Sequence, residues 1–278
     1  MKILYQSNSF STVKVNHGDE LLVNSSLIST DFEAVGQMVT DLKSFRIKKA
    51  RWDIYRSPDG SMNGGKELPE LAGVEAYFSA GGFLRRVVGD EAGGLPRELL
   101  AECVKGLIQA ETFVFIDRGY PSAKAYEDYW DEIYLNACRY YSNLERIARR
   151  WFDYVGYCHR ERNLFNRFLC CRVCGLDNGH LTASGSFSDS FHELGVCVDL
   201  NDGGTVVDCT GNFLRAPDQV CFENREHVLK LIGKKIARME KKEIGELVGG
   251  PHGCNHLVDI VHGIGKAVAV SLGMNREI

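Results

Sequence analysis

The stretch that decides the fold runs from His180 to Arg215 and reads HLTASGSFSDSFHELGVCVDLNDGGTVVDCTGNFLR. Apolar and polar residues alternate in it, and turn sequences rich in Ser, Asp, Asn and Gly interrupt the alternation at residues 188–190 and 201–204. Alternation broken by short turns is typical of an antiparallel meander. We therefore predict strands over residues 168–176, 180–187, 192–200 and 203–214.

The same pattern occurs earlier in the chain, displaced by 159 residues. Arg56-Ser-Pro58-Asp59 aligns with Arg215-Ala-Pro217-Asp218. Without a gap, the same shift also pairs Leu22 with Leu181, Ser25 with Ser184, Ser29 with Ser188, Phe32 with Phe191, Gly36 with Gly195 and Val39 with Val198. Average composition would give only about two or three identities over this length. The chain therefore contains an internal repeat.

Helical patterns follow the strands in both copies. They lie near residues 224–233 and 255–272 in the second copy and near residues 68–79 and 96–111 in the first. Between the copies, residues 123–151 are amphipathic, rich in aromatic residues and free of Gly and Pro, which predicts one long connecting helix. The predicted fold is α+β, with two tandem related units, each an antiparallel β-meander followed by helices. The predicted domains are residues 1–115, a helical connector at 116–165, and residues 166–278.

Composition excludes several classes of partner. The formal net charge is −4 and no block of Lys and Arg dominates, so the chain lacks the basic surface that nucleic acid requires. There is no run of eighteen apolar residues, and the apolar stretch at the start is too short for a signal peptide. We expect a cytoplasmic protein whose partner is another protein or a small molecule.

Cysteine and histidine are distributed unevenly. Of ten cysteines only Cys103 and Cys138 precede residue 150, and of eight histidines only His17 does. The densest cluster is Gly249-Gly-Pro-His-Gly-Cys254-Asn-His256, where the Gly and Pro residues place Cys254 and His256 at the start of the last helix. The exposed N–H groups of a first helical turn favour a thiolate, the form of cysteine that binds metal or attacks an electrophile.

Two more residues complete a predicted metal site. Cys221 lies where a strand gives way to a helix, and His192 lies at the start of a strand. His192, Cys221, Cys254 and His256 together suit zinc or iron, including an iron–sulfur cluster. Asp189, His252 and His262 remain alternative ligands. In the first copy, Glu33, Arg97 and Leu99 stand at the positions of His192, Cys254 and His256, so that copy lacks the site.

The second copy resembles two families. Phe191-His-Glu-Leu, Arg215-Ala-Pro-x-x-x-Cys221 and Gly-Gly-x-x-Gly-Cys254-x-His256 resemble a bacterial family catalogued as domain of unknown function 2889, over about residues 165–272. That family implies no established activity. More loosely, the order of elements is similar to that of the IscU/NifU-type iron–sulfur scaffold proteins. In that likeness Cys221 matches one cluster ligand, but Asp189 and His192 stand where the scaffold has its first cysteine.

Three functions fit these patterns. The first is a metal-binding protein with a scaffolding or metal-handling role. The second is an enzyme that uses either a metal ion with Asp189 or Glu193 as general base, or Cys254 as a nucleophile activated by His256. The third is a pseudo-symmetric interaction platform with the connecting segment as its contact surface, which exposed Tyr and Trp side chains on that segment would support.

Overall fold

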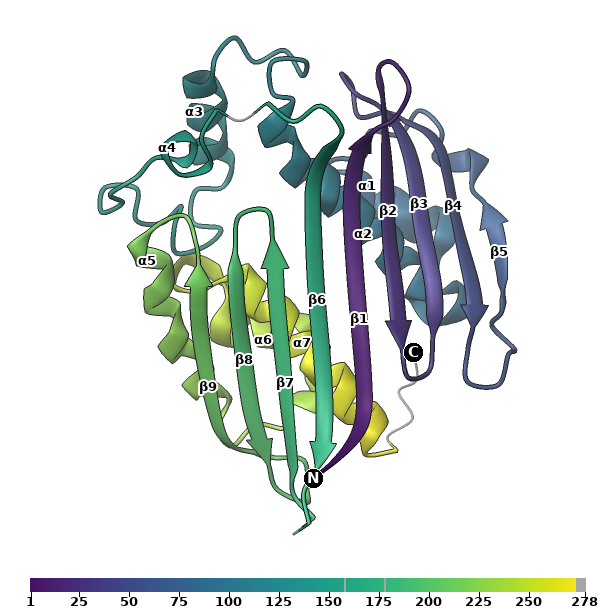
Figure 1. Cartoon of the computed structure of the whole chain (residues 1–278), viewed down its shortest axis with the longest axis vertical. Coiled ribbons are helices and arrows are strands. Elements are labelled where there is room, and N and C mark those ends of the chain that lie inside the picture. Colours follow the sequence, from purple (N-terminus) through teal and green to yellow (C-terminus); the bar gives the residue numbers. More distant parts are fainter. Residues whose placement is uncertain (158, 178, 274–278) are drawn as a thin grey trace. The chain divides into compact units, whose positions relative to one another are not determined.

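The computed structural model describes residues 1–273 except Cys158 and Asn178, and within them nine strands form one antiparallel sheet (Figure 1). The strand order is β5-β4-β3-β2-β1-β6-β7-β8-β9. The strands are β1 (Lys2–Val15), β2 (Glu20–Ser29), β3 (Glu33–Asp41), β4 (Ile47–Arg56), β5 (Gly64–Glu67), β6 (Asn163–Gly175), β7 (Leu181–Asp189), β8 (Glu193–Leu200) and β9 (Val206–Arg215). The sequence Asp177-Asn-Gly179, between the first two predicted strands, is typical of a turn, but Asn178 lies outside the described residues.

Seven α-helices accompany the strands in the described part of the chain. They are α1 (Ala80–Val88), α2 (Leu95–Ala110), α3 (Ala123–Ile133), α4 (Trp151–Val155), α5 (Gln219–Phe222), α6 (Lys241–Val248) and α7 (Asn255–Ser271). Short 3₁₀ helices occur as well, the longest being Glu223–Leu231. A large antiparallel sheet with helices confirms the predicted α+β class.

Most elements of the second copy lie where the sequence predicts them. The four predicted strands correspond to β6–β9, and α7 corresponds to the helix predicted over 255–272. Residues 224–233 form mainly a 3₁₀ helix rather than an α-helix. In the first copy α2 matches its prediction, but the helix predicted over 68–79 is wrong. Only Pro69–Leu71 is helical there, because Gly73 adopts a φ of +82° that ends the turn.

The prediction of one long connecting helix is also wrong. Residues 123–151 form α3, which ends at Ile133, and then a series of turns up to the start of α4. Asn136 has a φ of +64°, and the N–H of Arg139 donates to the carbonyl of Gly253 rather than within a helix. Every Tyr and Trp in residues 123–154 is buried or partly buried, so this segment lacks the exposed aromatic side chains that would have supported an interaction platform.

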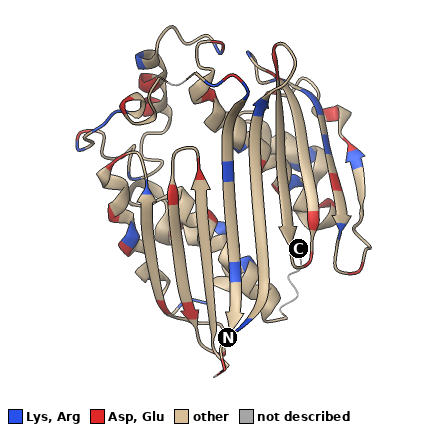
Figure 2. Cartoon of the chain, in the orientation of Figure 1, with Lys and Arg blue, Asp and Glu red and all other residues tan. Residues whose placement is uncertain are grey.

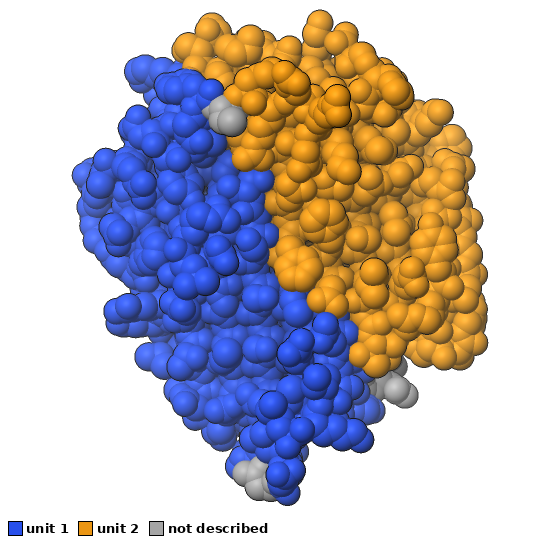
Figure 3. All heavy atoms as spheres, in the orientation of Figure 1, with its two compact units in different colours: residues 1–7, 124–157, 169–276 blue, residues 8–123, 158–168, 277–278 orange. Residues whose placement is uncertain are grey.

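The chain divides into two compact units, coloured separately in Figure 3. Unit 1 comprises residues 1–7, 124–157 and 169–276, and unit 2 comprises residues 8–123, 158–168 and 277–278. Neither unit is continuous in sequence, because β1 and β6 each contribute residues to both.

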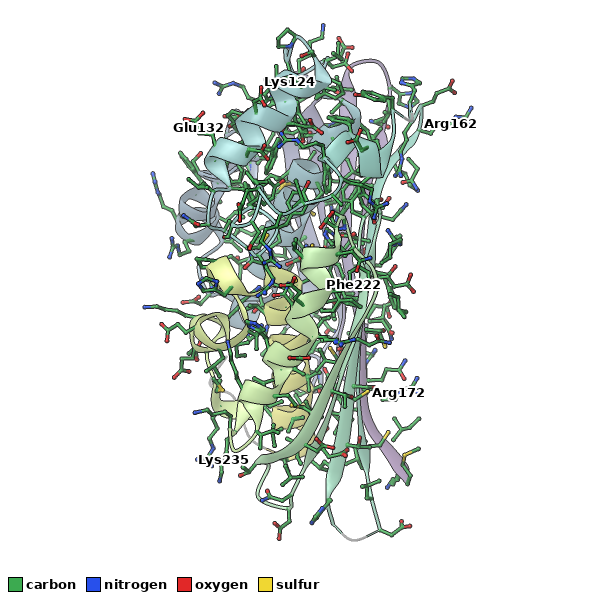
Figure 4. All side chains as sticks on the ribbon, turned by 90° about the vertical axis from the view of Figure 1, so that its left-hand side faces the viewer. Lys124, Glu132, Arg162, Arg172, Phe222 and Lys235 are labelled. Carbon is green, nitrogen blue, oxygen red and sulfur yellow. The ribbon has the colours of Figure 1, made fainter. Side chains whose placement is uncertain are left out.

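In unit 1, helix α7 packs on the sheet through a point of close approach. Gly185 of β7 faces α7, and a Cβ atom built there would lie 2.5 Å from Cγ2 of Ile260. The buried face of α7 includes Ile260, Val261 and Ile264 and belongs to one core with β6–β9. Seen from the side in Figure 4, Arg172 of β6 points away from the helices of this unit. This packing carries the first turn of α7 to the end of β7.

Strands β2–β4 and β7–β9 have matching pairing patterns. Leu27 pairs with Ala34 and Ala34 with Ile54, while Phe187 pairs with Leu194 and Leu194 with Phe213. Both patterns contain bulges after the first residue of the middle strand and near its end. This strand pairing relates β2 and β3 to β7 and β8 by a shift of 160 residues, not 159. The difference matters because a register slip of one residue moves every side chain of a strand to the opposite face of the sheet. The ungapped alignment is therefore wrong by one position before β4.

Charge is mixed along the described chain. Figure 2 shows Lys and Arg interspersed with Asp and Glu on strand ends and helices. Within the described residues, no helix combines the length and the apolar character needed to cross a bilayer.

Candidate functional site

The turn between β7 and β8 is built around the carboxylate of Asp189. Its Oδ1 accepts hydrogen bonds from the backbone N–H groups of Phe191, at 2.7 Å, and His192, at 2.6 Å. The N–H of Asp189 in turn donates to the carbonyl of His192 at 2.9 Å. These bonds form an Asx-turn, which Asp favours because its short side chain reaches the backbone two residues on. The carboxylate is therefore fixed before any ligand arrives, and its side chain is only 1% exposed.

Two histidines converge on this carboxylate. Nδ1 of His192 lies 3.2 Å from Oδ1 of Asp189, and Nε2 of His256, in the first turn of α7, lies 3.8 Å from Oδ2. The two rings are 4.1 Å apart between centroids with an interplanar angle of 36°. One ligand atom from each of the three residues lies within 4.8 Å of the others. The histidines are 14% and 22% exposed, so solvent reaches the group from their side.

Electrostatics keep the carboxylate ionised. Burial alone would raise the pKa of Asp189, but the charge and hydrogen bond of His192 and the charge of His256 lower that pKa well below its usual range. An anionic oxygen is therefore present beside two imidazoles, as a cation site requires.

Neighbouring side chains hold the turn from outside. Arg215, at the end of β9, donates to the carbonyl oxygens of Asp189, at 2.7 Å, and His192, at 3.2 Å. From α4, the Tyr154 hydroxyl donates to the carbonyl of Phe191, and the Trp151 ring meets the Phe191 ring edge-on at 4.8 Å. The turn is thus fixed by β9 and α4 as well as by its own hydrogen bonds.

Cys254 lies beside this group rather than within it. It is the N-cap residue of α7, and its Sγ lies 3.7 Å from Nδ1 of His256. Burial raises the pKa of its thiol to about 12, although the first-turn N–H groups of Leu257 and His256 oppose that rise. The unligated thiol is therefore protonated at neutral pH.

Cys221 lies in α5. It belongs to the buried core that also contains Cys254, and burial raises the pKa of its thiol. The charges of Cys254 and Cys138 would raise that pKa further, so these three thiols are electrostatic neighbours.

Among the predicted ligands, the structure thus brings His192 and His256 together, with Cys254 adjacent and Cys221 outside the group. The third member, Asp189, stands in the sequence prediction only as an alternative. His252 is exposed in the 3₁₀ helix Gly250–His252, and neither it nor His262 belongs to the group. The Ser-Asp-Ser turn before a strand was the signal that could have identified Asp189, because Asp in such a turn folds back onto the following N–H groups.

The other meander has the same turn without the ligands. The Oγ of Ser29 accepts from the N–H groups of Asp31, at 3.2 Å, and Phe32, at 2.9 Å, and the N–H of Ser29 donates to the carbonyl of Phe32. Arg56 donates to the carbonyls of Ser29 and Phe32, as Arg215 does in the second copy. Ser29 and Phe32 therefore occupy the positions of Asp189 and His192, and the predicted counterpart Glu33 is displaced by one residue.

Comparison with known proteins identifies one family. Residues 178–269 match the family model described as "Protein of unknown function (DUF2889)". The match includes Asp189, His192, Cys221, Cys254 and His256, but not the α4 residues Trp151 and Tyr154 that support the turn. No protein of curated function matches the chain.

Proposed function

We propose that residues 178–269 bind a divalent transition-metal ion through Asp189, His192 and His256. The observation that carries this proposal is the clustering of one carboxylate oxygen and two imidazole nitrogens within 4.8 Å. Two histidines and one carboxylate are a ligand set used for zinc and for non-haem iron(II). Asp189, His192 and His256, the candidate ligand group, therefore fit zinc or iron. Cys254 lies close enough to interact with His256.

Comparison of the two meanders supports this proposal. Ser29 closes its turn with the same hydrogen bonds that Asp189 makes, so neither a carboxylate nor a following imidazole is needed for that turn to fold. A buried carboxylate carries a desolvation cost that serine avoids. The acid and the histidine in the second copy are thus better explained by a ligand than by the turn.

Three protein ligands leave coordination positions for water or another molecule. A zinc ion held in this way supplies a Lewis acid and lowers the pKa of bound water. As a metal ligand whose Oδ1 also accepts two backbone N–H groups and faces His192, Asp189 would not serve as the general base in this arrangement. Metal storage or transfer needs only the ligands, so metal handling remains the leading role and catalysis the alternative.

The test is the metal content of the purified protein. We expect bound zinc or iron in wild type and about one ion per chain less in Asp189→Asn, His192→Phe and His256→Leu, because each change removes one of three ligands. His192→Phe copies the residue present in the other meander. His252→Gln, which alters an exposed histidine outside the group, is the matched control. Absence of metal from wild type, or equal metal in all variants, would refute the proposal.

A second candidate function uses a different set of neighbouring side chains. Cys254, His256 and Asp189 stand in series, with 3.7 Å from Sγ to Nδ1 and 3.8 Å from Nε2 to Oδ2. A thiol, an imidazole and a carboxylate in this order form the set used in nucleophilic catalysis by cysteine. Burial, which raises the thiol pKa to about 12, weighs against it.

Alkylation separates the two functions. In metal-free protein at neutral pH, a nucleophilic Cys254 would react with iodoacetamide faster than the exposed Cys197, and His256→Leu would remove that excess. If Cys254 reacts more slowly than Cys197 with and without His256, the nucleophile function is excluded. The metal-binding proposal is unaffected by that result.

A further inference from the structure

The two nitrogens of the His256 ring face different surroundings. Nε2 is directed to Asp189, at 3.8 Å from Oδ2, whereas Nδ1 is directed to Cys254, at 3.7 Å from Sγ. The Nε2 side is lined by oxygen and nitrogen donors and the Nδ1 side by sulfur. The metal group formed by Asp189, His192 and His256 uses the Nε2 side only.

Cys138 lies next to Cys254 although 116 positions separate them in sequence (254 − 138). The N–H of Arg139 donates to the carbonyl of Gly253 at 3.0 Å. Cys138 directly precedes Arg139, and Cys254 directly follows Gly253. A second bond, from Nδ2 of Asn255 to the carbonyl of Ala137 at 3.3 Å, fixes the same two segments. The turn after α3 is therefore held against the start of α7.

The three thiols share one environment. Cys221 and Cys254 belong to the core of unit 1, and Cys138 packs against that core. Burial is the largest cause of a raised pKa in each of the three, and the charge of Cys138 would act on both of the others. The Cys254 thiol faces Nδ1 of His256 at 3.7 Å, and the thiols of Cys138 and Cys221 share its environment, a clustering beyond the single buried cysteine that packing alone explains.

We infer that Cys138, Cys221, Cys254 and Nδ1 of His256 form a second metal position, suited to zinc. The inference rests on the proposed function in one respect, because His256 is common to both positions. Two ligands of one tetrahedral zinc ion, at the usual Zn–S and Zn–N bond lengths, stand about 3.6 Å apart. The separation of 3.7 Å between Sγ of Cys254 and Nδ1 of His256 agrees with that value.

Closing this position requires the ligand atoms to move closer together. No sulfur belongs to the group of described residues whose ligand atoms lie within 4.8 Å of one another, so Cys138 and Cys221 must move toward Cys254 and His256 before all four can bind one ion. Each thiol that binds releases its proton to solvent, and when both positions are filled the His256 ring also releases its N–H proton and bridges the two ions as an imidazolate. The thiolates prefer zinc to harder ions such as magnesium or manganese. The Asp189 side of the ring would retain its preference for oxygen- and nitrogen-bound metals.

Titration with Co²⁺ under reducing, anaerobic conditions tests the inference, because cobalt bound to thiolate absorbs strongly in the near ultraviolet and cobalt bound to oxygen and nitrogen does not. We expect this band in wild type and in Asp189→Asn. In Cys138→Ser we expect it to fall by about one third, since one of three thiolates is lost. Cys209→Ser, which alters a buried thiol bonded to the carbonyl of Val228, is the matched control and should leave the band unchanged.

A second measurement uses wild-type protein and needs no variant to fold. Zn²⁺ should protect Cys138, Cys221 and Cys254 from N-ethylmaleimide in partly denaturing urea, as read from peptide masses, while Cys209 stays unprotected. If cobalt binds to wild type without producing the near-ultraviolet band, and does not bind to Asp189→Asn, this inference is overturned and the proposed function stands. A band that is unchanged in Cys138→Ser would also overturn it. If Asp189→Asn shows the near-ultraviolet band and contains as much metal as wild type, the result supports the thiolate position and counts against the Asp189 group.

Discussion

Asp189 performs two tasks with one carboxylate. Its Oδ1 closes the β7–β8 turn, while Oδ2 faces His256. The serine at the equivalent position of the other meander performs only the first task. The second task therefore depends on a substitution that leaves the backbone hydrogen bonds unchanged.

Asp189 should make stability depend on pH. The folded-state pKa of this carboxyl is lowered, so its ionised form stabilises the folded protein above the unfolded-state pKa of about 3.9, and this contribution declines as pH falls below that value. Urea unfolding of wild type and Asp189→Asn in EDTA should show wild type more stable near pH 6 and a smaller difference near pH 3. A difference that grows on acidification would mean that the carboxyl binds its proton more tightly in the folded state.

At this scale the sequence predicts histidines better than it predicts their partner. His256 follows from a Gly- and Pro-rich segment that must start a helix, and His192 from its place at a strand start. The Ser-Asp-Ser turn indicates that Asp189 folds back onto the following N–H groups, but it does not indicate that the second carboxylate oxygen faces a histidine. Cys138 was missed for another reason, since its approach to Cys254 depends on a backbone hydrogen bond between residues 139 and 253.

Among the elements, α7 and β7 position the candidate ligand group through Gly185. The strand carries Asp189 at its end and the helix carries His256 at its start, and the two pack where Gly185 meets Ile260. Any side chain at residue 185 would move the helix or its side chains. The distance between ligands therefore depends on a residue that contacts neither of them.

Gly185→Ala should weaken both packing and metal binding. The added Cβ would lie 2.5 Å from Cγ2 of Ile260 and 3.2 Å from Ile264, an overpacking that costs about 1–3 kcal/mol of unfolding free energy. We expect a lower urea midpoint and reduced metal affinity. Gly195→Ala is the control, because its Cβ would meet only the carbonyl of Gly185 at 3.4 Å, so its effect should stay within about 0.5 kcal/mol. Equal effects of both changes would exclude close packing as the cause.

Strands were predicted more reliably than the connecting helix. Alternation and turn residues specify β7–β9 locally, whereas residues 134–150 carry no Gly or Pro that would signal an end to helix. Asn136 supplies the left-handed conformation instead, which Asn tolerates better than most residues. The carbonyl of Gly253 then binds an N–H that the helix would have used, so tertiary contacts determine where α3 ends.

For the whole molecule, metal binding should appear as stability. A ligand that binds only the folded state stabilises it by about 2.7 kcal/mol when present at one hundred times its dissociation constant. Zn²⁺ should therefore raise the urea midpoint of wild type relative to EDTA, and raise that of Asp189→Asn less. An identical midpoint with Zn²⁺ and with EDTA would contradict binding to the folded protein.

Local sequence patterns could not predict that all the strands join into one sheet. The predicted meanders account for β7–β9 with β6, but residues 2–15 were not assigned as a strand, and β1 lies beside β6 in the strand order. Pairing between distant segments leaves no periodic signal in either of them. The compact units are for this reason discontinuous, and residues 1–7 belong to the unit that contains residues 169–276.

The division of β1 between two units has a consequence during synthesis. Gln6 hydrogen-bonds Arg172 across 166 residues, and translation of that length takes on the order of 10–30 s at about 5–20 residues per second. For an interval of that length the first residues of β1 are outside the ribosome while their β6 partners have not yet emerged, and an unpaired strand edge invites association with other chains. The yield of correctly folded protein should thus respond to translation speed and to chaperones that shield nascent strands.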